Sequence, residues 1–191
     1  MSGISIVALG ASLGGLEALQ RILSALPAPL GATIVIAQHR RRDPNSQLCA
    51  LLGRRCRLPV VEPEDKTPVE SNKVYLAPAD YHLLVEPGWL ALSVDAPVCY
   101  ARPSIDVLFE SVADAYGSAA LGVMLTSSNH DGAEGLAAIE RAGGGALVQD
   151  PSTAESPVGP LAAIAKLRVG AKLSLEQIAD EIIRRCRSRQ Q

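Results

Sequence analysis

The chain has 191 residues, of which 48% are hydrophobic and 20% are charged, and its formal net charge is −2. This composition is ordinary for a compact globular protein, and we expect one domain spanning residues 1–191. The near-neutral charge excludes a global electrostatic argument for DNA, RNA or an anionic membrane as the main partner.

The amino terminus lacks the basic segment and the long apolar core of a signal peptide. No apolar run elsewhere approaches the roughly 20 residues that a transmembrane helix needs. We therefore expect a cytoplasmic protein without membrane insertion. The cysteines are widely spaced, with no C-x-x-C pair and no clustered histidines, and predict free thiols rather than a zinc site. They are Cys49, Cys56, Cys99 and Cys186.

The first forty residues predict a strand, a helix and a second strand. Residues 4–9 form a short apolar run rich in β-branched side chains, and apolar residues then recur at helical spacing over 16–26. Two prolines end this helix. Residues 33–37 are apolar on both faces, as expected of a strand buried in a parallel sheet. Together these segments predict a βαβ unit.

The middle of the chain predicts a short helix and an antiparallel element. Asp43 is a candidate cap and Pro44 a candidate first helical residue for a helix from Leu48 toward Gly53. A segment rich in Glu, Pro and Lys then looks like a surface loop, and three strand signals follow it. The loop is 62–72, and the strand signals are 74–77, 82–85 and 89–94. The last two are joined by a turn as a hairpin, which we expect to be appended to one edge of the main sheet.

Strands and helices alternate again in the remainder of the chain. We expect helices at 103–116, 131–141, 160–167 and 174–187, and strands at 119–125 and 146–149. The last helix opens with a Ser174-x-x-Gln177 capping box. Fully apolar strands that alternate with helices predict an α/β fold, with a doubly wound, mostly parallel sheet covered by helices on both faces.

The turn after the first strand carries a candidate nucleophile. Gly10-Ala11-Ser12-Leu13-Gly14 matches G-x-S-x-G between a predicted strand and a predicted helix, the context that gives this short motif meaning. The helix amino terminus behind Ser12 offers backbone N–H groups to a developing oxyanion. The alternative is a phosphate-binding loop of a nucleotide-binding enzyme. Two features weaken it: Ser12 replaces the middle glycine, and Gln38-His39 ends the second strand in place of an acidic residue.

A serine nucleophile needs a base, and the base needs an acid to orient it. His39 follows the second strand and Asp131 follows a later one, so both are expected at the crevice outside the carboxyl ends of the strands. His130 lies on the same loop and is an alternative base, whereas His82 is interpreted as structural. The simplest structural role for Asp131 is the N-cap of the helix that follows it.

Several segments, taken together and in order, resemble the catalytic domain of the chemotaxis methylesterase family CheB over about residues 4–167. The segments are Gly10-Ala11-Ser12-Leu13-Gly14-Gly15, Gln38-His39, Leu76-Ala77-Pro78 with Tyr81-His82, Arg102-Pro103-Ser104-Ile105-Asp106-Val107-Leu108-Phe109, Leu125-Thr126 through Asp131-Gly132-Ala133-Glu134-Gly135, and Gln149-Asp150. The resemblance implies a serine hydrolase that removes methyl groups from glutamate γ-methyl esters on the cytoplasmic helices of chemoreceptors, and in some members also deamidates receptor glutamines. It implies no metal ion and no organic cofactor.

The resemblance also assigns roles to individual residues. Ser12, His39 and Asp131 correspond to the nucleophile, base and orienting acid of the family. We expect Leu13, Gly14 and Ser128 to belong to the oxyanion and substrate site, and Arg102 to line it and steer an acidic protein segment.

Three features depart from the family pattern. Leu13 stands where threonine is usual, Ser127-Ser128-Asn129-His130 replaces a loop that usually begins Gly-Met-Gly, and Arg40-Arg41-Arg42 replaces a common Met-Pro. The three arginines either form a solvated basic turn or attract acidic receptor helices to the site. The first strand begins too early for the amino-terminal receiver domain of typical members. The chain is therefore either a stand-alone homologue controlled in another way, such as by a separate regulatory protein, or an isolated catalytic domain. The alternative to an active enzyme is a silent homologue that binds partners.

Overall fold

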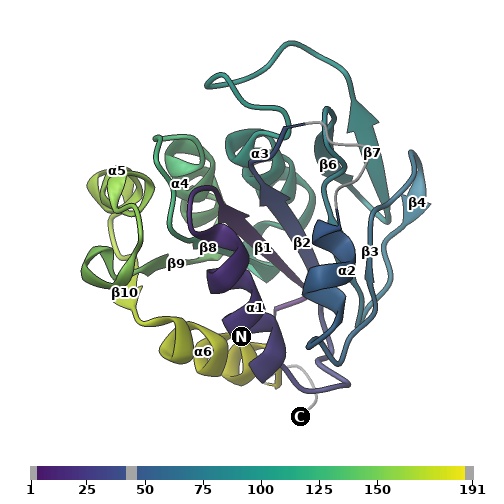
Figure 1. Ribbon diagram of the computed structural model, residues 1–191, viewed down its shortest axis with the longest axis horizontal. Helices are drawn as coiled ribbons and strands as arrows, with labels where there is room; N and C mark the ends of the chain where they lie inside the picture. The colour runs from purple at the N-terminus through teal and green to yellow at the C-terminus, as the bar shows by residue number, and fades with distance from the viewer. Residues whose placement is uncertain (1–3, 42–46, 188–191) are drawn as a thin grey trace.

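A computed structural model describes residues 4–41 and 47–187 of the chain. Its centre is a seven-stranded, fully parallel sheet with the order β10-β9-β8-β1-β2-β5-β3 (Figure 1). The strands are β1 (Ile6–Ala11), β2 (Thr33–Gln38), β3 (Val60–Val61), β5 (Val74–Leu76), β8 (Ala120–Met124), β9 (Gly145–Gln149) and β10 (Ala171–Leu173). The predicted doubly wound α/β fold is confirmed.

Helices cover both faces of this sheet, as Figure 1 shows. They are α1 (Gly15–Ala25), α2 (Leu48–Gly53), α3 (Ile105–Tyr116), α4 (Ala133–Arg141), α5 (Val158–Lys166) and α6 (Leu175–Arg187), with 3₁₀ turns η1 (Gly117–Ala119) and η2 (Pro151–Thr153). Val7 and Leu9 of β1 pack in the core layer under α1, α2 and α6, whereas Ile6 and Ala8 pack in the layer under α3, α4 and α5. Alternate residues of one buried strand thus serve two cores, so the strand is apolar throughout.

The predicted hairpin forms, but it does not extend the main sheet. Strands β6 (His82–Glu86) and β7 (Trp89–Ser93) pair antiparallel and are joined by β4 (Thr67–Pro68) in a separate three-stranded sheet. The edge beyond β5 is already occupied by β3, so the hairpin packs against α3 instead. The interpretation of residues 62–72 as a loop missed β4, which is only two residues long.

Some element boundaries differ from the predictions for local reasons. Helix α3 begins at Ile105, because the Ser104 side chain caps it by accepting from Val107 N–H, so Pro103 lies outside the helix. Strand β10 was not predicted. The capping box of α6 is confirmed, with mutual bonds between Ser174 and Gln177. The suggested cap at Asp43-Pro44 lies outside the described residues.

The sheet order places the candidate site. The chain runs outward from β1 through β2 on one side and then returns to β8 on the other, so the order switches direction at β1. Loops that leave the carboxyl ends of β1, β2 and β8 therefore meet at one crevice. Within the part of the chain that the structure describes, no helix has the length and apolar character needed to cross a bilayer.

Candidate active site

Ser12 and His39 lie side by side where two neighbouring strands end. Ala11 of β1 is in register with Gln38 of β2, so Ser12 and His39 are each one residue beyond a paired position. The His39 N–H donates to the Ala11 carbonyl at 3.0 Å, which continues the ladder past the strand end. Adjacent strands are about 4.8 Å apart. Both residues consequently line one open hollow of about 950 Å³.

The glycines of the turn allow the chain to reverse sharply behind Ser12. Gly14 is the N-cap of α1 at φ +78°, a left-handed conformation that favours glycine. A Cβ on Gly15 would overlap the Gln38 side chain and would lie 2.8 Å from the Ala11 Cβ. The turn therefore requires small residues at both positions, which explains the motif in steric terms.

Two N–H groups at this turn are available to a ligand. Those of Leu13 and Gly14 make no hydrogen bond to any residue in 4–41 or 47–187. They lie at the amino terminus of α1, where the helix dipole favours negative charge. The Leu13 side chain is 52% exposed and lines the hollow. This arrangement is suited to stabilising an oxyanion.

His39 and Asp131, 92 positions apart, form the strongest polar contact of the site. His39 Nε2 and Asp131 Oδ2 are 2.6 Å apart, and the Asp131 side chain is fully buried while that of His39 is 12% exposed. Asp131 also accepts from Ile105 N–H at 2.7 Å, Asp106 N–H at 3.0 Å and the Ser104 hydroxyl at 2.8 Å. The carboxylate thus holds His39 while it is itself held by the first turn of α3.

The expectation that Asp131 caps the helix that follows it is wrong. Gly132 is the N-cap of α4, at φ +101°, and makes no side-chain cap bond. The Asp131 carboxylate turns instead to the amino terminus of α3, which lies beside it in the fold. A side chain can satisfy the free N–H groups of any helix end within reach, and local sequence does not say which.

The surroundings of Asp131 keep it ionised. Burial tends to raise the pKa of this carboxyl, but the hydrogen bonds from His39, Ile105, Asp106 and Ser104 outweigh burial, and the pKa is lowered. An ionised Asp131 requires a proton on His39 Nε2, which leaves Nδ1 with a free lone pair. His39 is therefore oriented as a base.

The third member of the predicted triad is adjacent but not bonded. The Ser12 hydroxyl makes no hydrogen bond to His39 or to any other residue within the described ranges. Bonds of this kind are often long or absent without substrate and form in the reacting complex. The structure thus joins His39 to Asp131 directly and places Ser12 in the hollow that His39 also lines.

Two residues that the sequence analysis did not single out support the site. Gln38 Nε2 donates to the Ser12 carbonyl at 2.8 Å and to the His39 carbonyl at 3.1 Å. Thr126 Oγ1 donates to the Leu13 carbonyl at 2.8 Å, and the Thr126 carbonyl accepts from Ser12 N–H at 2.9 Å. Both residues lie in segments that carry the family resemblance, and this resemblance is the sequence signal that could have identified them.

Ser127 and Ser128, neighbours on the loop after β8, differ in their access to the hollow. Ser127 is buried, and its N–H donates to the Ser156 carbonyl at 3.1 Å, so that N–H is not available to a substrate. Ser128 is exposed and lines the hollow that contains Ser12. Of the predicted binding residues, Leu13, Gly14 and Ser128 therefore share this hollow with Ser12.

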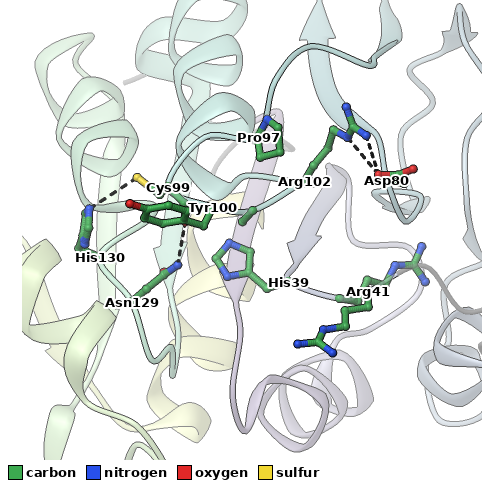
Figure 2. Close-up of a pocket in the computed structure, with 11 residues that line it drawn as sticks. His39, Arg41, Asp80, Pro97, Cys99, Tyr100, Arg102, Asn129 and His130 are labelled. Carbon is green, nitrogen blue, oxygen red and sulfur yellow. Dashed lines mark hydrogen bonds and ion pairs between the residues drawn. The ribbon is translucent and has the colours of Figure 1, made fainter.

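The other two histidines have different surroundings. His82 is 1% exposed; its Nδ1 accepts from Ser104 N–H at 3.2 Å and its Nε2 lies 3.1 Å from the Ala96 carbonyl. It braces the segment that leads into α3. His130 is exposed, and its Nε2 lies 3.6 Å from Cys99 Sγ (Figure 2). The histidine that bonds Asp131 is His39. The alternative that His130 serves as the base has no geometric support.

A second hollow, of about 820 Å³, adjoins the first and shares His39 with it. Arg102 lines this hollow, but its guanidinium bonds Asp80 at 2.6 Å (Figure 2). The same group donates to the Val94 and Asp95 carbonyls at 2.7 and 3.0 Å. Arg40 bonds Glu62 and the Ala77 carbonyl in the same way. Their guanidinium groups are thus engaged by the protein.

Arg41 differs from the neighbouring arginines. It lines both hollows and makes no ion pair with any residue of 4–41 or 47–187. Arg42 lies outside the described residues, so only part of the arginine run can be placed. Of the arginines that line the hollows, Arg41 is the one that pairs with no described acidic residue.

Asp131, the partner of His39, belongs to a cluster of two carboxyl groups and one thiol. One oxygen each of Asp106 and Asp131 and the Cys99 sulfur lie within 4.8 Å of one another. Burial raises the pKa of Asp106 to about 6, aided by the charge on Asp131. Burial likewise raises the pKa of the Cys99 thiol, and both carboxylates raise it further. The Asp131 oxygens already accept four hydrogen bonds, so this carboxylate is committed to the protein.

Comparison with known proteins agrees with this geometry. The family model described as CheB methylesterase matches residues 7–182. A putative protein-glutamate methylesterase/protein-glutamine glutaminase of Leptospira interrogans serogroup Icterohaemorrhagiae serovar copenhageni (strain Fiocruz L1-130) is 42% identical over 179 residues, 93% of each chain. A protein-glutamate methylesterase/protein-glutamine glutaminase of Trichodesmium erythraeum (strain IMS101) is 36% identical over 95% of this chain, which spans 53% of that protein.

A solved structure extends the likeness to three dimensions. The crystal structure of the Thermotoga maritima CheB methylesterase catalytic domain matches with a TM-score of 0.91 at 29% sequence identity. The match covers 96% of this chain and 99% of that one. Matches of this extent in both sequence and fold show that the chain belongs to the CheB methylesterase family.

Proposed function

We propose that the chain is a serine hydrolase that removes methyl groups from glutamate γ-methyl esters of chemoreceptors and deamidates receptor glutamines at the same site. The observation that carries the proposal is the 2.6 Å bond between His39 and a buried, ionised Asp131, beside a serine on a strand-to-helix turn. The names of the Leptospira and Trichodesmium relatives support the substrate class.

The proposed reaction is acyl transfer in two steps. His39 Nδ1 takes the proton of the Ser12 hydroxyl as its oxygen attacks the ester carbonyl. The N–H groups of Leu13 and Gly14 stabilise the tetrahedral oxyanion. His39 then gives the proton to the departing methoxide oxygen, which leaves as methanol, or to the amide nitrogen, which leaves as ammonia. Water activated by His39 finally hydrolyses the acyl-enzyme, releasing glutamate and free Ser12.

Asp131 acts on this cycle through His39. Each time His39 accepts a proton it becomes an imidazolium, and a carboxylate 2.6 Å away stabilises that charge. Because Asp131 is anchored by Ser104 and the first N–H groups of α3, it cannot rotate away from the imidazole. The geometry therefore favours one tautomer and one ring orientation.

The proposed substrates are the cytoplasmic helices of methyl-accepting receptors. Glutamates beside a methylated position carry negative charge, and Arg41 offers an open positive charge next to His39. Arg102 contributes to the same field, although its guanidinium is engaged by Asp80. We further propose that the reaction takes place in the cytoplasm and is controlled through a separate regulatory protein.

The decisive experiment measures methanol release from methylated receptor fragments. Ser12→Ala should reduce release by several orders of magnitude. Ser24→Ala is a matched control, because that serine is exposed on α1 and bonds only the Arg21 carbonyl one turn earlier. His39→Gln should also abolish release, and His130→Gln should lower the rate far less. Near-normal release by Ser12→Ala, or no release by the wild-type chain, would contradict the proposal.

A further inference from the structure

A cysteine and a histidine, two residue types that can ligate metal ions, lie close together beside the proposed catalytic residues and have no role in the proposed reaction. Cys99 lies on a turn between β7 and α3, and His130 lies on the loop after β8, 31 positions later. Figure 2 shows their side chains pointing toward one another at the rim of the hollow that His39 also lines. The sequence spacing gave no sign of this pair.

The separation of the two ligand atoms matches the requirement of a tetrahedral ion. Zinc binds thiolate sulfur at about 2.3 Å and imidazole nitrogen at about 2.0–2.1 Å, so a tetrahedral angle places sulfur and nitrogen about 3.6 Å apart. Cys99 Sγ and His130 Nε2 are 3.6 Å apart. An ion could therefore bind both atoms with little rearrangement of either residue.

The backbone that presents Cys99 is strained. Cys99 and Tyr100 have φ values of +50° and +63°, a left-handed conformation that residues with a Cβ rarely adopt. The Tyr100 side chain is fully exposed, so its own packing does not hold the turn. Paired bonds between Val98 and Ala101 close the turn, and Asn129 Nδ2 donates to the Cys99 carbonyl at 3.4 Å. The conformation thus serves to place Cys99 against the loop of His130.

The electrostatic surroundings favour a cation. The sulfur lies within 4.8 Å of a carboxylate oxygen of Asp131 and one of Asp106. Of the arginines that line the hollow, Arg40 and Arg102 are compensated by Glu62 and Asp80, whereas Arg41 makes no ion pair with a described residue. Remaining coordination positions open toward the hollow, where water or a substrate carboxylate can complete the ligand set.

We propose that Cys99 and His130 bind a divalent ion of the zinc class, and that the bound ion inhibits the neighbouring hydrolase. Binding displaces the thiol proton to solvent, and the sulfur and the imidazole nitrogen donate electron pairs to the metal. Because the thiol proton leaves as the divalent ion enters, the site gains a net charge of +1 near His39, which disfavours the imidazolium that the reaction must form. Binding stands on the geometry alone, whereas inhibition rests on the proposed function.

The test of binding uses untagged protein, since a histidine tag binds zinc itself. Zinc affinity is measured by competition with a chromophoric chelator, and cobalt(II) added in its place reports sulfur ligation through a thiolate charge-transfer band. Cys99→Ser and His130→Ala should each weaken zinc binding by about tenfold or more, and Cys99→Ser should remove the cobalt band. Cys49→Ser is a matched control, because that half-buried thiol donates to the Val60 carbonyl and lines neither hollow.

Two outcomes would overturn the site: zinc affinity unchanged in both variants, or a cobalt complex of the wild-type chain without a thiolate band. The inhibition is tested as the ratio of methanol release with and without zinc, which should be well below one for wild type and near one for Cys99→Ser. A ratio near one for wild type at saturating zinc would overturn the inhibition. An enzyme inactive even in chelator would contradict the proposed function and leave the binding result standing.

Discussion

Replacement of Asp131 by asparagine should nearly abolish hydrolysis while the chain stays folded. The carboxylate accepts four hydrogen bonds, two on each oxygen. If the amide oxygen keeps the bonds from Ser104 and Asp106, the amide nitrogen replaces Oδ2, the atom that accepts from Ile105 N–H and faces His39 Nε2. An amide nitrogen donates and cannot accept.

The consequence for catalysis follows from the tautomer of His39. An amide that donates to Nε2 forces the imidazole proton onto Nδ1, which then has no lone pair for the Ser12 hydroxyl. Reversal of the tautomer in a triad of this type lowers turnover by about 10⁴-fold. In the structure, Asp131 bonds the His39 imidazole and Ser12 lines the same hollow as His39, so the substitution acts on Ser12 through this ring.

Asp131→Asn should affect the stability of the fold less than it affects turnover. The Ile105 N–H loses its acceptor in a buried setting, which costs about 1–3 kcal/mol of unfolding free energy. Ser104→Ala is the matched comparison: it removes one donor to Asp131 and the cap of α3, costing about 1–2 kcal/mol, but leaves the carboxylate on His39. We expect Ser104→Ala to keep most of its activity.

The two variants are compared by denaturant unfolding and by methanol release. Similar stabilities with activities that differ by orders of magnitude would support the role of Asp131 as the acid that orients His39. Turnover of Asp131→Asn within about tenfold of wild type would refute the reasoning, since the wrong tautomer cannot sustain that rate.

Two further predictions concern the surroundings of this site. Burial raises the pKa of Asp106 from 3.8 to about 6, so its stabilising contribution is full below about pH 4 and is lost as the pH rises through 6. Asp106→Asn keeps an acceptor for Gly135 N–H but removes the titrating carboxyl. Between pH 4 and pH 7.5 the unfolding free energy of this variant should therefore rise by about 2–3 kcal/mol relative to that of the wild type. Parallel pH profiles of stability for the two proteins would contradict this. Gly14→Ala places a Cβ on a residue with φ +78° and 2.6 Å from a Glu155 carboxylate oxygen. We expect this variant to lose about 1–2 kcal/mol of unfolding free energy, measured by thermal unfolding. It should also release methanol more slowly than the wild type, because the turn that carries Ser12 has to move.

The main sheet and the position of the site were predictable from local patterns. Strands such as β1 and β2 are buried on both faces, so their apolar runs and the intervening helical spacing report directly on a parallel sheet. The rule that such sheets bind ligands beyond their carboxyl ends then selected Ser12, His39 and Asp131. The structure places all three at that edge and bonds two of them.

The sequence could not determine which polar side chains from distant segments come into contact, because hydrophobic periodicity carries no information about such pairs. The carboxylate of Asp131 caps α3 rather than the adjacent α4, Arg102 is engaged by Asp80, and Cys99 meets His130 across 31 positions. Each contact satisfies a polar group with whichever partner the packed elements bring within reach. Hydrophobic periodicity determines which face of a segment is buried, but only packing of the whole chain decides which polar atoms become neighbours.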